Sequence, residues 1–181
     1  MTTQIHVEPK QPAVNAPVIV RLTADEMTKA AAVGAYRRIK SIVNRRNLNT
    51  SLKREEFDRW QADIEGALAE MAVVKVLRQP WTGSIPNGEF KGADVGDKVQ
   101  VRSTRYADGC LILYPNDYDA HLYVLCVGAY GTYRLAGWVS GSAGKDARYW
   151  MGDGVKQWPA FFVPQKALRP IRELMEMLHV A

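Results

Sequence analysis

At 181 residues the chain has the length of one ordinary domain, which excludes two full-sized domains with separate cores. Hydrophobic residues make up 47% and charged residues 24% of it, and these proportions exclude a wholly disordered or fibrous protein. Lys and Arg outnumber Asp and Glu by 24 to 19, and the net charge of +5 favours a polyanionic partner. The apolar runs are too short to span a bilayer, so we expect a cytoplasmic protein with no membrane partner.

The first half of the chain predicts a flexible arm followed by two helices. Residues 1–17 hold three prolines and no clear period, which is typical of a mobile arm preceding a single domain at 18–181. Thr23 and Glu26 fit a capping box, and apolar spacing predicts a helix over 24–46. A second helix is predicted over 52–77, in which Gly66 suggests a close approach of another backbone. Together they form a helical layer over 23–78.

The second half switches to alternating, β-branched and aromatic residues, which predicts a sheet over 88–140. We expect the strands near Phe90–Val95, Lys98–Thr104, Leu111–Tyr114, His121–Gly128 and Tyr133–Ser140. A closing segment over 159–181 should contain a helix from about Gln165. Cys126 lies in an apolar strand and is interpreted as a small core residue. The fold class predicted is α/β, with a mixed sheet flanked by helices.

Polar residues gather where the first expected strands meet. Asp94 ends one strand, and a tight turn leads into the next, where alternation places Gln100 and Arg102 on one face. Metal-dependent phosphodiester hydrolysis needs oxygen ligands around a divalent cation together with a cationic group for the phosphate. A half-exposed edge strand would show the same alternation, so the pattern leaves both interpretations open.

The order of these motifs resembles the PD-(D/E)XK nuclease superfamily, the restriction-endonuclease-like fold. The resemblance covers roughly residues 64–140 and rests on Gly66-Ala67-Leu68-Ala69-Glu70 in a helix, then Asp94, then Gln100-Val101-Arg102. Within the superfamily the chain is most similar to small proteins of tailed bacteriophages that share its short motifs. These motifs are AEMAV, VQVRST, YVLCVG, GWVSG and FVPQ-x-x-L.

The resemblance implies a divalent-metal site and its catalytic residues. Asp94 would be the central metal-binding acid, Glu70 the helical acid, Gln100 the residue at the (D/E) position, and the Val101 carbonyl a further ligand for Mg²⁺ or Mn²⁺. Arg102 stands where the family has lysine, and an arginine stays protonated and cannot act as a base. Glu65 competes with Glu70, but five residues apart on a helix the two cannot face the same site.

Two basic stretches are candidates for binding a phosphate backbone. Each is equally typical of a solvated surface. The candidate nucleic-acid-binding residues are Arg37, Arg38, Lys40, Arg45, Arg46, Ser103, Thr104 and Arg105.

The sequence therefore predicts a phage-type protein that processes DNA, a metal-dependent endo- or exonuclease of the host cytoplasm. Because many enzymes of the superfamily pair their sites, a homodimer is one expectation. The departure at Arg102 supports an alternative, a catalytically degenerate nuclease-fold protein that binds DNA or a host nuclease, repair or restriction protein. A third interpretation is a virion or scaffold component with no nucleic-acid role.

Overall fold

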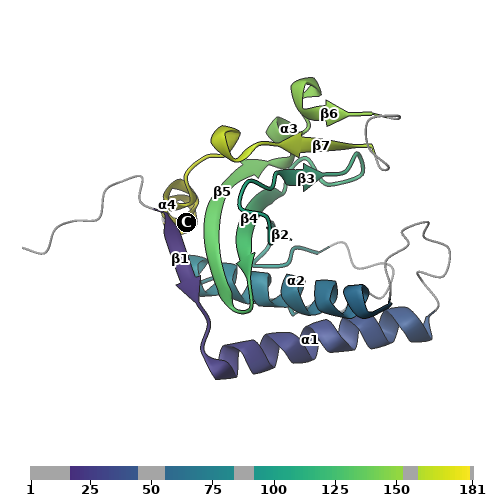
Figure 1. Cartoon of the computed structure of the whole chain (residues 1–181). Helices are drawn as coiled ribbons and strands as arrows, with labels where there is room; N and C mark the ends of the chain where they lie inside the picture. The colour runs from purple at the N-terminus through teal and green to yellow at the C-terminus, as the bar shows by residue number, and fades with distance from the viewer. Residues whose placement is uncertain (1–16, 45–55, 84–91, 153–158, 180–181) are drawn as a thin grey trace, which may run out of the picture.

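The computed structural model describes residues 17–44, 56–83, 92–152 and 159–179, and these form a mixed α/β structure (Figure 1). Two long helices lie side by side under a four-stranded sheet, and a smaller sheet covers the other face of that sheet. The α/β class predicted from the sequence is confirmed. The predicted arm over 1–17 lies outside the described residues except for residue 17. The strand predicted over Phe90–Val95 is wrong in its described part, since residues 92–95 form no strand and only Val95 makes single bridges.

The helical layer consists of α1 (Ala24–Val43) and α2 (Glu56–Leu77). The predicted capping box is present, because the Thr23 hydroxyl accepts the Glu26 N–H while the Glu26 carboxylate accepts the Thr23 N–H at 2.7 Å. The helices approach each other closely at Gly34, where an added Cβ would lie 2.5 Å from the Ile64 Cα. The close approach expected at Gly66 is wrong, since a Cβ there would meet no described atom within 4 Å.

The larger sheet has the strand order β1-β5-β4-β2. Its members are β1 (Val18–Arg21), β2 (Val99–Thr104), β4 (Leu122–Ala129) and β5 (Thr132–Ser140). β2 runs parallel to β4, whereas β4–β5 and β5–β1 are antiparallel. A parallel pair requires a crossover, and the chain between β2 and β4 supplies it. β2 is therefore an edge strand. Among the described residues, only two isolated bridges extend the sheet beyond it, one between Val95 and Val99 and one between Trp81 and Val95.

The smaller sheet has the order β3-β7-β6 and is antiparallel. It is formed by β3 (Leu111–Leu113), β6 (Trp150–Met151) and β7 (Ala160–Val163). The sequence predicts only β3, because two- and four-residue strands give too few alternations to reveal a period. Short helical turns flank these strands: α3 (Gly141–Gly144) and η1 (Ala147–Tyr149) lie between β5 and β6, and η2 (Gln165–Ala167) follows β7.

The final helix begins later than the sequence indicated. α4 spans Ile171–His179, and the expected start at Gln165 is wrong because that residue opens only the single turn η2. Pro170 accounts for the difference, since proline disfavours helical backbone at the preceding residue but suits the first turn of a helix. The described helices include none with the length and apolarity of a membrane span.

The described residues form two hydrophobic cores, one between each pair of neighbouring layers. The first lies between the helices and the larger sheet and includes Val99, Val124 and Cys126. The second lies between the two sheets and includes Tyr123 and Leu125. Because neighbours along β4 belong to different cores, the two faces of β4 and of its partner β2 point into different layers.

Candidate functional site

Glu70 is a buried carboxylate on α2, only 6% exposed. Arg37 of α1 donates to both of its oxygens, Nη1 to Oε1 at 2.5 Å and Nη2 to Oε2 at 2.9 Å. The Trp81 indole Nε1 donates to Oε2 at 3.0 Å. A bidentate arginine and an indole fix the carboxylate in position and compensate its burial.

Asp94 lies beside the free edge of β2, just before the bridge at Val95. Its Oδ2 accepts the Val101 N–H at 2.8 Å, and its carbonyl accepts the Thr82 hydroxyl at 2.9 Å. Burial, reinforced by the negative charge of Glu70, raises the pKa of Asp94 from 3.8 to about 6. The Val101 N–H and the charges of Arg102 and Arg37 oppose this rise without cancelling it. Two buried carboxylates that repel each other electrostatically favour binding of a proton or a cation between them.

The Val101 peptide faces the same edge as Asp94. In an extended strand the N–H and C=O of one residue point to the same side. Because the Val101 N–H donates to Asp94, its carbonyl also points away from β4 and toward that edge. The carbonyl accepts only a long hydrogen bond from Arg102 Nη1, at 3.4 Å, among the described residues. Its position is compatible with the ligand role that the family resemblance implies for it.

Gln100 and Arg102 share the other face of β2, as alternation predicts. Gln100 Nε2 donates to the Gly92 carbonyl at 3.0 Å and lies 3.2 Å from His121 Nδ1. Val99 and Val101 instead pack toward the helices. Glu70 and the two polar side chains of β2 therefore lie on opposite faces, with Asp94 at the edge between them.

Arg102 is held by an ion pair. Its Nη2 donates to both oxygens of Asp117, at 2.9 and 3.0 Å, and its Nε donates to the Ile112 carbonyl at 3.3 Å. The guanidinium carbon lies 5.3 Å from the centre of the Tyr123 ring. No local pattern in the sequence indicates Asp117, because the pairing depends on how the crossover folds back over β2.

The atoms near Asp94 that could bind a cation are oxygen atoms, and oxygen ligands suit Mg²⁺ or Mn²⁺. Glu70 is already committed to Arg37 and Trp81, so it fits a supporting role beside the cation. Asp94, the Val101 carbonyl and the Gln100 amide remain as potential direct ligands. The described part of the chain contains no group of three or more His, Cys, Asp or Glu side chains that could hold a metal ion. Such a site would therefore leave several positions to water or to a substrate phosphate, as Mg²⁺ sites commonly do.

The candidate nucleic-acid-binding residues fall into separate places. Arg37 holds Glu70, and Arg38 is 4% exposed with its Nη1 3.7 Å from Asp63. Lys40 lies over the Tyr36 ring, and the candidates at 45 and 46 are outside the described residues.

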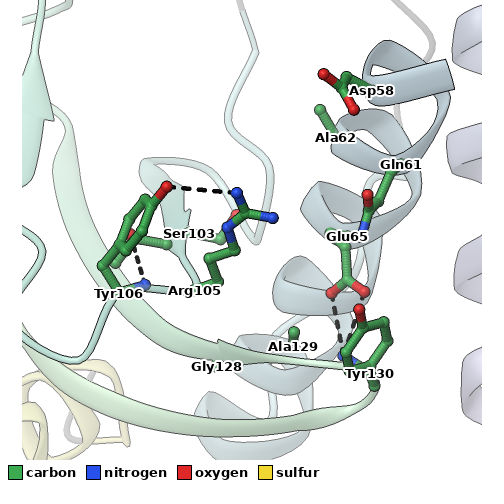
Figure 2. Close-up of a pocket in the computed structure, with 11 residues that line it drawn as sticks. Asp58, Gln61, Ala62, Glu65, Ser103, Arg105, Tyr106, Gly128, Ala129 and Tyr130 are labelled. Carbon is green, nitrogen blue, oxygen red and sulfur yellow. Dashed lines mark hydrogen bonds between the residues drawn. The ribbon is translucent and has the colours of Figure 1, made fainter.

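A pocket of about 350 Å³ contains the remaining candidates, Ser103, Thr104 and Arg105 (Figure 2). It lies between the first half of α2 and the ends of β2 and β4. Glu65 lines it and accepts the Tyr133 hydroxyl at 2.6 Å, so Glu65 and Glu70 occupy different sites, as the helical period predicted. Tyr106, which continues the polar stretch of Ser103, Thr104 and Arg105, lines the pocket as well. Asp58, Gln61 and Tyr130 also line it and were not singled out from the sequence.

Cys126 and His121 take the roles of packed residues. The Cys126 side chain is fully buried, and burial raises the pKa of its thiol far above the usual range, which confirms its interpretation as a core residue. Burial lowers the pKa of His121, whose Nδ1 lies 3.2 Å from Gln100 Nε2.

Comparison of the chain with protein-family models, with curated proteins and with solved structures finds no match in any of the three. Assignment of a function therefore depends on the site itself.

Proposed function

We propose that this protein binds DNA and hydrolyses its phosphodiester bonds with the help of Mg²⁺ or Mn²⁺. The observation that carries the proposal is the cluster of Asp94, Glu70 and the Val101 peptide at the free edge of β2. A carboxylate whose pKa is raised by burial and by a second carboxylate is a typical feature of a functional site. The same proposal includes a restriction-endonuclease-like arrangement, a phage origin and action in the host cytoplasm.

Each residue of the cluster has a distinct part in the proposed reaction. Asp94, the Val101 carbonyl and the Gln100 amide would hold the cation, and Arg37 and Trp81 orient the Glu70 carboxylate beside it. When bound, such a cation stabilises the charge that develops on the phosphate and lowers the pKa of coordinated water. Arg102 would contribute positive charge near the phosphate but no base, because a guanidinium does not release its proton at neutral pH.

The direct test is a cleavage assay on DNA oligonucleotides and plasmid with Mn²⁺ or Mg²⁺. We expect wild-type protein to cut and a folded Asp94→Ala variant to fall to background. Asp97→Ala is the matched control, because Asp97 is an exposed turn residue three positions away that makes no part of the cluster. Equal cutting by wild type and Asp94→Ala would refute the proposal.

A second candidate function, DNA binding without cleavage, is favoured by the ion pair between Arg102 and Asp117. Asp117 neutralises the cation that would otherwise face a phosphate, because both of its oxygens accept from Arg102 Nη2. The variant Arg102→Lys separates the two functions. A working enzyme that relies on this arginine should lose cleavage, whereas a degenerate site with an otherwise intact cluster should gain it.

A further inference from the structure

The pocket beside β2 has two walls of different chemistry (Figure 2). One wall is cationic and aromatic. Arg105 Nη2 donates to the Tyr106 hydroxyl at 3.3 Å, and its guanidinium carbon lies 5.3 Å from the centre of the Tyr106 ring. Tyr106 is 62% exposed, so a flat group entering the pocket can reach both side chains. Stacking on tyrosine and arginine is how proteins hold unpaired bases.

The facing wall, on α2, is rich in hydrogen-bond acceptors. It presents the carboxylates of Asp58 and Glu65 and the amide of Gln61. Glu65 is fixed in place by the Tyr133 hydroxyl and by the Tyr130 N–H, which lies 3.2 Å from each of its oxygens. A ligand edge that carries amino groups suits this wall better than one that carries only carbonyl oxygens.

Tyr130 stands at the rim of the pocket in an unfavourable backbone conformation. Its φ is 54° and that of Gly131 is 77°, and this pair of positive angles is typical of a tight hairpin turn that prefers Asn or Gly at both positions. The Tyr130 side chain is 75% exposed, so packing in the core does not explain a tyrosine here. A ligand that stacks on the ring would explain it.

The pocket and the Asp94 cluster lie along the same pair of elements. On α2, the pocket residue Glu65 precedes Glu70 by five residues, which is about 7.5 Å along the helix axis, although the two side chains point to different faces. On β2, Val101 and Thr104 are three residues apart, which corresponds to about 10 Å of extended chain. A DNA strand whose phosphate lies at the cluster would therefore bring a nearby nucleotide to the pocket.

We propose that this pocket receives an unpaired base of the DNA strand, adjacent to the phosphate at the Asp94 cluster. The base stacks against Tyr106 and Tyr130, and its exocyclic amino group donates to the acceptors of α2. Cytosine, adenine and guanine carry such a group and thymine does not, so the pocket selects against thymine. The inference rests on the proposed function for the position of the strand, and it adds the substrate class, single-stranded or locally opened DNA.

The test measures binding without cleavage, by fluorescence anisotropy of dye-labelled dC and dT homopolymers in EDTA. We expect wild-type protein to bind the dC oligomer about tenfold more tightly than the dT oligomer. Tyr130→Gly relieves the backbone and should keep the fold, yet weaken dC binding by about tenfold. Asp58→Ala should move the ratio of the two affinities toward one. Tyr114→Ala, which removes a 44% exposed tyrosine outside the pocket, is the matched control and should bind as wild type does.

Equal affinity for dC and dT, or wild-type binding by Tyr130→Gly, would overturn the inference. These outcomes are separate from those of the cleavage assay. Cleavage that depends on Asp94 together with binding indifferent to Tyr130 would leave the proposed function standing and remove the base pocket. Selective binding that depends on Tyr130, without any cleavage, would support the base pocket and refute the proposed nuclease function.

Discussion

Replacing Asp94 with asparagine should stabilise the folded protein at neutral pH. Asparagine keeps the shape of the side chain and an oxygen that can accept the Val101 N–H, but it carries no charge. In the wild type the pKa of Asp94 rises from 3.8 to about 6 on folding, because burial and Glu70 disfavour its ionised form. The variant removes this unfavourable ionisation while the ion pair of Glu70 with Arg37 stays in place.

The magnitude follows from the two pKa values. At about 1.36 kcal/mol per pH unit, the change from 3.8 to about 6 corresponds to about 3 kcal/mol. The folded state holds the proton more tightly than the unfolded chain, so wild-type stability is greatest below the unfolded pKa and falls as pH rises to about 6. The advantage of the Asp94→Asn variant should therefore reach about 3 kcal/mol at pH 8, which is ~6–12 °C in Tm, and nearly vanish near pH 4.

Urea unfolding of both proteins across this pH range measures the difference. A stabilisation that grows between about pH 4 and pH 7 supports the environment described for Asp94. If Asp94→Asn destabilises the protein by the same amount at every pH, burial does not disfavour the ionised carboxylate of Asp94, and the reasoning is refuted. Asp97→Asn serves as the control, since it makes the same chemical change at an exposed turn residue three positions away.

Three further changes test other contacts. Arg37→Met should cost about 3–5 kcal/mol in urea unfolding because it strands the buried Glu70 carboxylate, and a similar cost in a Glu70→Leu background would contradict this. Gly66→Ala should stabilise α2 by about 1 kcal/mol, whereas Gly34→Ala should destabilise the protein because the added Cβ clashes with Ile64. A lower Tm for Gly66→Ala and a higher Tm for Gly34→Ala would contradict the helix packing. In the native protein a thiol reagent should modify Cys110 and reach Cys126 only on unfolding, so rapid modification of both thiols would be inconsistent with the core.

Local patterns predicted the elements that surround the site. The capping box located the start of α1, alternation assigned the faces of β2, and the helical period separated Glu65 from Glu70. These features depend on neighbours within a few residues, which is the range over which periodicity carries information.

The contacts that define the site depend on tertiary pairing and were not predictable in this way. Arg37 reaches Glu70 across the helix pair, and Arg102 reaches Asp117 because the crossover returns over β2. The charge of Arg37 suggested phosphate binding equally well, since nothing local distinguishes a buried partner from a solvated one. Tyr130 offered one usable sign, because a bulky residue before Gly131 in a hairpin turn is unusual and invites a functional explanation.

The measurement that tests the central claim most directly is isothermal titration of Mn²⁺ into wild-type protein, Asp94→Asn and Asp97→Asn. We expect a single binding event in wild type and Asp97→Asn that is lost in Asp94→Asn. Because the pKa of Asp94 is about 6, titration near that pH in two buffers should also reveal release of part of a proton on binding. Binding that persists unchanged in Asp94→Asn, or wild-type protein that takes up no Mn²⁺, would contradict a cation site at this edge of β2.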